Sequence, residues 1–265
     1  MKKYTSSEIR NVGFVAHSGS GKTMLADAFL FNAKATTRLN RPDDENSTFD
    51  FEPEAINRRS SIAIGVGYAE WKKHKINILD TPGDFNFGNE TILATRAMDA
   101  SICLVSAVDG VEVGTEKVWA VISEQNMPRA IVINKIDRER ASFAETMADI
   151  KENLTTGVTP VQLPIGSEEG FKGIVDLVAN KAYIFKADGS YTSEAIPADM
   201  ADEVAEAREA LIEGVAESDE ELLEKFFEEG TLDDDDLKSG LAKGFKAGTF
   251  VPVYCTSASK NIGVT

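Results

Sequence analysis

The sequence predicts an α/β fold, in which a mostly parallel sheet carries helices on both faces and is interrupted by an α+β insert. Short apolar runs rich in β-branched residues recur along residues 11–134, and most are followed by a stretch of helical periodicity. Strands that alternate with helices in this way form parallel sheets that are buried on both faces. The rhythm stops after Gly157, and one more apolar run follows near the end of the chain, which indicates the insert.

The first half of the chain supplies most of the predicted sheet. A strand at 11–16 precedes a glycine-rich turn and a helix at 22–32. The polar stretch 33–61 is expected to be a long loop, and loops of this length are usually functional or disordered. The remaining elements are expected in the order strand 62–71, strand 74–79, helix 88–98, strand 100–108, helix 114–125, strand 130–134 and helix 138–153.

The second half has a different pattern. Short strand candidates at 160–165, 173–177 and 181–185 precede two acidic helices at 197–227 and 233–246. The apolar run 250–256 is assigned back to the first sheet. We therefore expect a core formed by residues 1–157 and 250–265, and an inserted sub-domain at residues 158–249.

Composition narrows the class of protein. The 265 residues carry a formal net charge of −16, whereas nucleic-acid binders usually carry a basic patch, so no direct nucleic-acid contact is expected. No segment approaches the roughly 18 apolar residues that cross a bilayer, and the first residues do not form a signal peptide. Cys103 and Cys255 lie in apolar runs, as small core residues of a reducing compartment do. We expect a cytoplasmic protein without a membrane partner.

A phosphate-binding loop is predicted between the first strand and the first helix. It comprises Ala16, His17, Ser18, Gly19, Ser20, Gly21, Lys22 and Thr23, with Ala16 in place of the usual leading glycine. In such loops, backbone N–H groups and the helix N-terminus surround the phosphates, the lysine reaches the β- and γ-phosphates, and the hydroxyl binds Mg²⁺. The alternative is a glycine-rich turn before an ordinary helix. The strand–turn–helix setting favours a nucleoside triphosphate without naming its base.

A second motif, Asp-Thr-Pro-Gly, follows the apolar run that ends at residue 79. Asp80 is placed at a strand end, where a carboxylate can hold Mg²⁺ through water, and the N–H of Gly83 can contact the γ-phosphate. Taken alone, these four residues are equally well explained as a turn.

Two more motifs indicate the base. The Asp137 carboxylate can accept from both N1–H and N2–H₂ of guanine, while Asn134 bridges toward the phosphate loop and the Lys135 stem lies over the base. After the last predicted strand, the backbone N–H of Ala258 is offered to guanine O6 within the motif Ser257, Ala258 and Ser259. Each motif is short, but all four follow strands, where ligands bind in parallel sheets. Their combination predicts a guanine nucleotide.

The chain resembles the nucleotide-binding part of elongation factor G, the ribosomal translocase, over nearly all of its length. The resemblance rests on Ala16-His17, Trp71 with residues 76–83, residues 134–138, the insert stretches 162–166 and 171–177, and residues 255–264. It implies a GTPase domain that binds GTP or GDP with Mg²⁺ and acts on the ribosome through the full-length protein. It also implies that Ser61, at the position of a family threonine, coordinates Mg²⁺, and that the insert faces ribosomal stalk proteins.

The sequence departs from that family at the catalytic position. The family usually has a histidine after Asp-Thr-Pro-Gly that positions the hydrolytic water, and Asp84 stands here instead. Ser18 and Ser60 replace residues that are usually apolar around that histidine. Gly19 replaces an aspartate, which removes a monovalent-cation site. These differences resemble the elongation factor G-like paralogues more than the main translocase.

Asp84 therefore leaves alternatives open. The chain is either the GTPase domain of an elongation factor G-like translation factor or a GTP-binding switch with little or no intrinsic hydrolysis. A ribosomal-protection factor of the tetracycline-resistance type shares this domain and is a third interpretation. We expect Asp84 to turn away from the nucleotide, because like charges repel. In the family a further helix follows the last strand, so we also expect a fragment of a longer protein whose sheet is partly uncovered.

Overall fold

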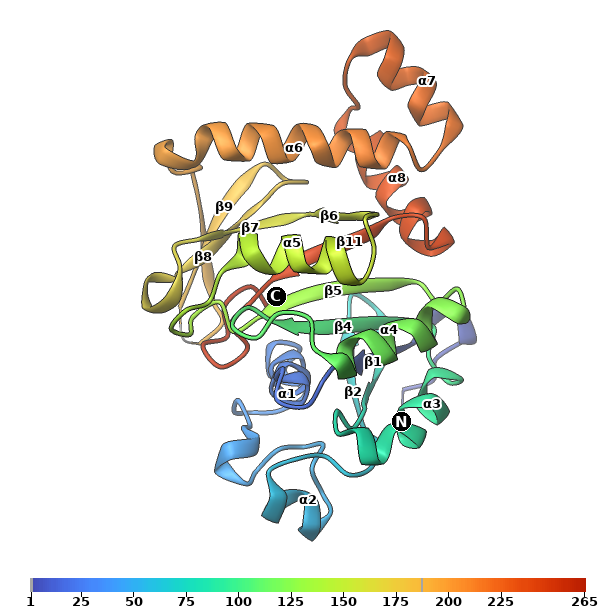
Figure 1. The fold of residues 1–265 in the computed structure, drawn as a ribbon, viewed down its shortest axis with the longest axis vertical. Coiled ribbons are helices and arrows are strands. Elements are labelled where there is room, and N and C mark those ends of the chain that lie inside the picture. The colour runs from blue at the N-terminus through green and yellow to red at the C-terminus, as the bar shows by residue number, and fades with distance from the viewer. Residues whose placement is uncertain (1, 187) are drawn as a thin grey trace.

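The computed structural model describes residues 2–186 and 188–265 and confirms an α/β fold with a mostly parallel central sheet (Figure 1). The main sheet has the strand order β2-β3-β1-β4-β5-β11-β6. Strand β2 pairs antiparallel with β3, and the other pairs in this sheet are parallel. The strands are β1 Ile9–Val15, β2 Gly65–Trp71, β3 His74–Asp80, β4 Ala100–Ser106, β5 Arg129–Asn134, β6 Val158–Pro160 and β11 Val251–Cys255.

Helices cover the two faces of this sheet unequally. Helices α3 (Gly88–Thr95), α4 (Val113–Glu124) and α5 (Phe143–Asn153) lie on the face toward the viewer in Figure 1, and α1 (Lys22–Asn32) lies behind it. Ile122 of α4 and Ile150 of α5 are fully buried in one apolar cluster with strand residues such as Ile131 and Val253. Each of these two helices is amphipathic and buries its apolar face against the sheet. This burial holds the helices in a layer on that face of the sheet.

Most of the residues predicted to form the insert lie above the main sheet in Figure 1. Their antiparallel sheet has the order β10-β9-β8-β7, with β7 Gln162–Ile165, β8 Gly173–Asp176, β9 Lys181–Phe185 and β10 Tyr191–Glu194. Helices α6 (Ala201–Ala216), α7 (Glu220–Glu229) and α8 (Asp234–Ala247) follow. Leu211 of α6 and Leu237 of α8 are fully buried with Leu177 and Phe250 in a second apolar cluster. The insert therefore packs directly on the segment that enters β11.

The predicted strand 160–165 is wrong as a single element. Pro160 ends β6 in the main sheet, while Gln162 begins β7 in the second sheet. Between them, the Val161 N–H donates to the Val253 carbonyl at 3.0 Å, and the Val161 carbonyl accepts from the Leu177 N–H at 3.0 Å. The chain crosses between the two sheets at this residue. Residues 158–160 were assigned to the insert, but they belong to the main sheet because β6 pairs with β11. The division of the chain into a core and an inserted sub-domain stays a prediction.

Three other element predictions also need correction. The stretch 33–61 contains a short helix, α2 (Pro53–Arg58), which proline begins and which Arg59 ends in a left-handed conformation. The helix predicted from residue 138 begins at Phe143, where the Ser142 hydroxyl accepts from the Glu145 N–H. The helix predicted over 197–227 is divided into α6 and α7, because the Asp219 carboxylate caps the start of α7. Strand β10, whose four side chains are all exposed, was not predicted.

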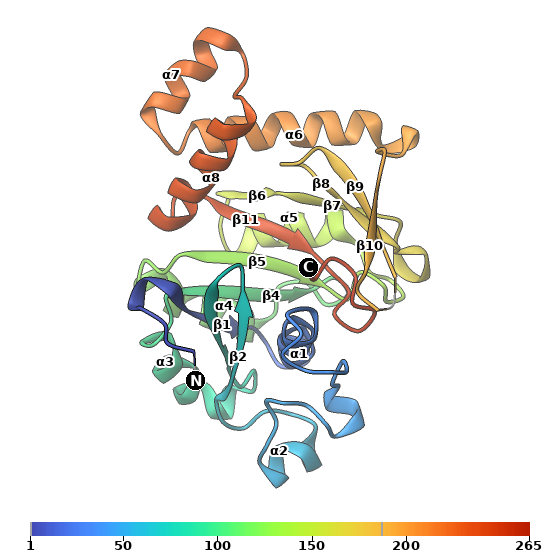
Figure 2. The ribbon, with the colours of Figure 1, turned by 180° about the vertical axis from the view of Figure 1, so that it is seen from behind.

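A groove on one face of the main sheet is lined by residues of α1 and α8, two helices that can be located in Figure 2. The groove has a volume of about 760 Å³, and its lining includes Val132, Leu241, Pro252 and Val264. Among residues 2–186 and 188–265, no helix is both long and apolar enough to cross a membrane.

Candidate nucleotide-binding site

The loop between β1 and α1 has the backbone that the phosphate-loop motif predicts. Gly19 and Gly21 adopt φ angles of 84° and 93°, in the left-handed region that favours glycine. A β-carbon on Gly21 would lie 2.5 Å from Asn134 Nδ2, so the second glycine is also required by close approach. The loop and the Asn134 side chain therefore pack closely together at Gly21.

Lys22 is the buried cation of this loop. The residue is 6% exposed, and its Nζ donates to the His17 carbonyl at 3.1 Å and to the Ala16 carbonyl at 3.4 Å. Burial lowers the pKa of this amine, while the nearby Asp80 raises it. A buried ammonium whose partners include only neutral carbonyls is stabilised by an anion that enters the loop.

A cluster of oxygen side chains lies beside Lys22. Thr23 Oγ1 donates to Asp80 Oδ2 at 2.6 Å and lies 3.2 Å from Ser61 Oγ. Ser61 Oγ in turn donates to Asp50 Oδ1 at 2.7 Å. The structure thus brings together the three predicted metal residues, Thr23, Ser61 and Asp80. Asp50 completes the cluster and was not predicted, since nothing in its local sequence distinguishes it from other acidic residues of the 33–61 stretch.

The chemistry of this cluster fits Mg²⁺. Burial raises the pKa of the Asp80 carboxyl to about 7, while Lys22 and Thr23 lower it. Within the described part of the chain, Asp80 Oδ1 is buried without a hydrogen-bond partner. The same described residues contain no cluster of three His, Cys, Asp or Glu side chains that could enclose an ion. Mg²⁺ is commonly held by one or two protein groups together with water and substrate phosphates, so a small oxygen cluster is enough.

Asn134 organises the opposite end of the site. Its Nδ2 donates to the Ser20 carbonyl at 2.9 Å. Its Oδ1 accepts from Thr256 Oγ1 and from the Ala258 N–H, both at 3.0 Å. The predicted bridge from Asn134 to the phosphate loop is present. The Ala258 N–H, which we expected to face guanine O6, is directed to Asn134 in this structure.

Asp137 lies next to this bridge and is 9% exposed. Its Oδ2 accepts from Ser259 Oγ at 3.4 Å. Its Oδ1 is buried, and no described residue offers it a hydrogen bond. Ser257 has a supporting role, since its Oγ accepts from the Lys260 N–H at 3.2 Å and its backbone pairs with Ile262. Asp80 and Asp137, which belong to opposite ends of the site, thus each have one buried carboxylate oxygen without a partner among the described residues.

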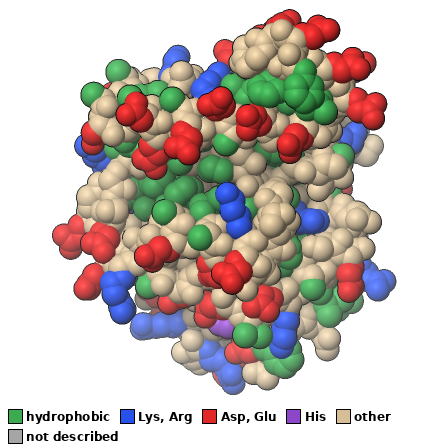
Figure 3. Space-filling model, turned by 45° about the horizontal axis from the view of Figure 1, so that its top comes forward, with side chains coloured by type: hydrophobic (Ala, Val, Ile, Leu, Met, Phe, Trp, Pro, Cys, Tyr) green, Lys and Arg blue, Asp and Glu red, His purple; other side chains and the backbone are tan. Residues whose placement is uncertain are grey.

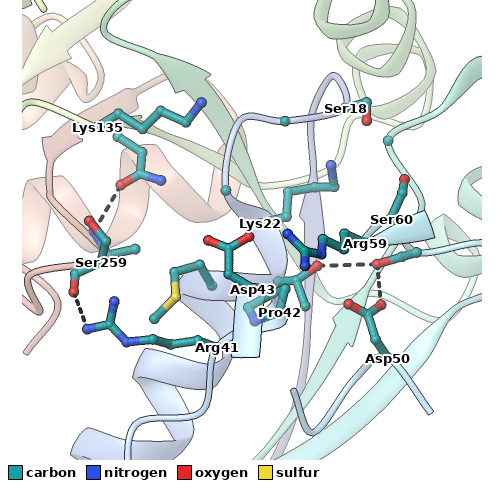
Figure 4. Close-up of a pocket in the computed structure, with 18 of the residues that line it drawn as sticks. Ser18, Lys22, Arg41, Pro42, Asp43, Asp50, Arg59, Ser60, Lys135 and Ser259 are labelled. Atoms are coloured by element: carbon teal, nitrogen blue, oxygen red, sulfur yellow. Dashed lines mark hydrogen bonds between the residues drawn. The ribbon is translucent and has the colours of Figure 1, made fainter. Parts of the chain in front are cut away.

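A cavity of about 350 Å³ joins these ends (Figure 4). Its lining includes most of the predicted residues, namely Ser18, Gly19, Gly21, Lys22, Thr23, Ser61, Gly83, Asn134, Lys135, Ala258 and Ser259. Ala16, His17, Ser20, Asp80, Asp84, Asp137 and Ser257 lie outside this lining. The lining also contains residues that the sequence did not single out as ligands, namely Met24, Arg41, Pro42, Asp43, Asp50, Arg59, Ser60 and Arg138.

The charge of the lining is opposite to that of the chain. Five of its side chains are basic and two are acidic, although the chain has a net charge of −16. The basic residues are Lys22, Arg41, Arg59, Lys135 and Arg138, and the acidic residues are Asp43 and Asp50. Such a concentration of positive charge in a concave site attracts an anion.

Gly83 lies at the phosphate end, whereas Asp84 is turned to a different cavity. A β-carbon on Gly83 would lie 2.4 Å from Lys22 Nζ and 2.7 Å from the Ser18 backbone nitrogen, so only glycine allows this approach. Asp84 Oδ1 accepts from the Asn86 N–H at 2.8 Å and from Asn86 Nδ2 at 2.9 Å. Asp84 lines a neighbouring cavity of about 460 Å³ together with His17. Within this arrangement the Asp84 carboxylate serves as a helix cap.

Comparison with known proteins agrees with this geometry. A family model described as the elongation factor Tu GTP-binding domain matches residues 7–265. The fold is also similar to a solved crystal structure, described as that of ttk003000868 from Thermus thermophilus, with a TM-score of 0.91 and 32% sequence identity. The match covers 98% of this chain and 39% of that one, so this chain spans about two-fifths of its relative's length. The match to the family model shows that the chain belongs to the elongation factor Tu GTP-binding domain family.

Proposed function

We propose that this GTP-binding translation-factor GTPase domain uses Mg²⁺ and acts on the ribosome as part of an elongation factor G-like protein in the cytoplasm. The observation that carries the proposal is the pair of buried carboxylates Asp80 and Asp137, which accept hydrogen bonds from Thr23 and Ser259 in the lining of the basic cavity and each keep one oxygen without a described partner. One fits a hydrated metal ion and the other fits a base with two N–H donors. The triphosphate would lie between them, along the phosphate loop.

The metal end would hold Mg²⁺ between the protein and the nucleotide. Thr23 and Ser61 would supply hydroxyl oxygens, and Asp80 would bind through water. Asp50 would orient Ser61, because it accepts the Ser61 hydroxyl proton. Bound Mg²⁺ would neutralise charge on the phosphates. Lys22 would leave its two carbonyl partners for the β- and γ-phosphates.

The base end would select guanine. Asp137 Oδ1 would accept from N1–H and Oδ2 from N2–H₂, and each hydrogen bond to a charged acceptor contributes about 1.5–3 kcal/mol. Adenine lacks this pair of donors on one edge. Guanine O6 would need a donor in the loop 257–259, either the Ala258 N–H after release from Asn134 or the neighbouring Ser259 backbone N–H.

The second part of the proposal concerns GTP hydrolysis. Whether the domain hydrolyses GTP by itself depends on the position of Asp84. A carboxylate 4 Å from a phosphate charge is repelled by roughly 4 kcal/mol at an effective dielectric of about 20. The hydrogen bonds from Asn86 to Asp84 stabilise the orientation away from the cavity. We therefore propose negligible hydrolysis by the free domain and activation on the ribosome. A GTP-binding switch without hydrolysis is the second candidate, and the same orientation of Asp84 favours it.

Single-turnover hydrolysis by the full-length protein separates these cases. The wild type, Asp84→His and Asp84→Ala are each measured with and without ribosomes. If the wild type is fast on ribosomes and Asp84→Ala is equally fast, another group positions the water. If Asp84→Ala is slow there, Asp84 itself is the positioning group, and the switch candidate is excluded. A slow wild type that gains activity as Asp84→His supports the switch and contradicts ribosome-activated hydrolysis.

The insert offers a surface for a second partner, and we propose a ribosomal stalk protein. Acidic side chains are dense on the face that carries the insert, and a hydrophobic patch lies among them (Figure 3). Phe227 of α7 is 77% exposed on this part of the molecule. An exposed aromatic side chain within a charged rim is typical of protein interaction sites.

A further inference from the structure

Arg59 is a cavity residue to which the motifs assign no role. It follows the last residue of α2 and adopts φ 50° and ψ 39°, a left-handed conformation. This conformation is unfavourable for a residue with a β-carbon, so a glycine would be easier to accommodate there. A strained non-glycine residue that faces a functional cavity suggests that its side chain is used.

The neighbouring residues fix the place of Arg59 along the cavity. Two residues later, Ser61 is held by Thr23 and Asp50 in the metal cluster. Figure 4 shows the Arg59 side chain with Lys22 and Ser60, on the side away from Lys135 and Ser259. Arg59 therefore lies at the phosphate end of the cavity.

The other arginines nearby have different positions. Arg41 donates from Nη2 to the Ser259 carbonyl at 2.9 Å, which places it at the base end. Arg138 directly follows the base-binding Asp137. Arg58 is bound by Glu54 at 2.6 Å on the exposed side of α2, outside the cavity. Unlike Arg41 and Arg58, Arg59 has no hydrogen-bonded or ion-paired partner for its guanidinium among residues 2–186 and 188–265.

We propose that Arg59 binds the terminal phosphate of GTP and thereby distinguishes GTP from GDP. This inference rests on the proposed binding of a guanine nucleotide in the cavity. A guanidinium presents a planar fork of N–H donors that matches phosphate oxygens. In some GTPases an arginine supplied by the nucleotide-binding chain itself stabilises the charge on the transferred phosphoryl group in the transition state, so a guanidinium can be accommodated at this position. Because Arg59 directly follows α2, this contact would link α2 to the nucleotide state.

The test measures binding of GDP and of a non-hydrolysable β,γ-imido analogue of GTP to the full chain with Mg²⁺. Arg59→Gly removes the side chain and fits the left-handed backbone, so the fold is preserved. Arg59→Lys keeps the charge without the fork, and Arg58→Ala is the matched control. We expect Arg59→Gly to weaken the analogue at least about tenfold while GDP changes less than about threefold. The affinity of Arg59→Lys for the analogue should lie between those of Arg59→Gly and the wild type. Arg58→Ala should bind both nucleotides as the wild type does.

Two results would overturn the proposal. An unchanged affinity of Arg59→Gly for the analogue would show that the side chain makes no phosphate contact. An equal loss for GDP and the analogue would place its contact elsewhere on the nucleotide. Failure of the proposed function has a different signature, because the wild type itself would then bind neither guanine nucleotide. In that case the proposed role of Arg59 is excluded together with the proposed function.

Discussion

At the scale of single residues, Asp80 shows how a functional group conflicts with stability. Its pKa is raised from 3.8 to about 7 by burial. The folded chain without ligand therefore keeps a proton that the unfolded chain releases between about pH 4 and pH 7. Stability falls as pH rises through this window, and above the folded pKa the whole penalty is present. Bound Mg²⁺ would offset the charge that causes this penalty.

Asp80→Asn should therefore stabilise the nucleotide-free chain when Mg²⁺ is chelated. The amide oxygen can still accept from Thr23, while no charge is buried. We expect the melting temperature of the variant to exceed that of the wild type at about pH 8 and the gain to shrink at about pH 5. The same variant should bind GTP with weaker dependence on Mg²⁺. A gain in melting temperature that is equal at both pH values would contradict the electrostatic explanation.

The residues of the site differ in how far sequence could predict them. Lys22, Thr23, Asp80, Asn134 and Asp137 occur in short motifs, each at the end of a strand. Their side chains meet because the carboxyl ends of parallel strands share one edge of the sheet. Asp50, Arg41 and Arg59 come from a polar stretch without periodicity. The places of Arg41 and Asp50 depend on contacts with residues farther along the chain, Ser259 and Ser61, which local sequence does not encode.

At the scale of elements, most strands and helices of the main sheet could be predicted from apolar periodicity. The errors have both local and long-range causes. Asp219 accepts from the N–H groups of Glu221 and Leu222 and so starts α7 within a stretch that is acidic throughout. The break at Val161 has no such local signal, because it depends on hydrogen bonds to Val253 and Leu177.

Helix α6 provides a test of how the insert is held. Leu211 is fully buried in the cluster that joins α6 to Leu177 and Phe250. Leu211→Ala should lower the free energy of unfolding by about 2–5 kcal/mol, because it removes apolar contacts and leaves a cavity. Glu213→Ala, a change at an exposed residue of the same helix, should shift it by less than about 0.5 kcal/mol. Urea unfolding followed by circular dichroism measures both, and similar values for the two variants would contradict the packing described for α6.

At the scale of the whole molecule, the nucleotide site lies at one edge of the main sheet. Its residues come from widely separated parts of the chain, between positions 18 and 259. The chain is strongly acidic, yet the cavity at this edge is lined mainly by basic side chains. A second sheet and helices α6, α7 and α8 lie between β6 and β11 along the chain, and yet these two strands are paired. The nucleotide site and the proposed partner surface of the insert thus belong to different parts of one folded chain.

The central claim is that Asp137 selects a guanine nucleotide in this cavity. The most direct test is a competition titration in which GTP, ATP and xanthosine triphosphate displace a labelled guanine nucleotide from the wild type and from Asp137→Asn. We predict that only GTP competes well for the wild type. Because the carboxylate that accepts both donors of guanine is lost, the variant should bind GTP at least about tenfold more weakly. It should also gain affinity for xanthosine triphosphate, whose ring has a carbonyl where guanine has an amino group. Displacement from the wild type by ATP as effective as that by GTP would contradict the account.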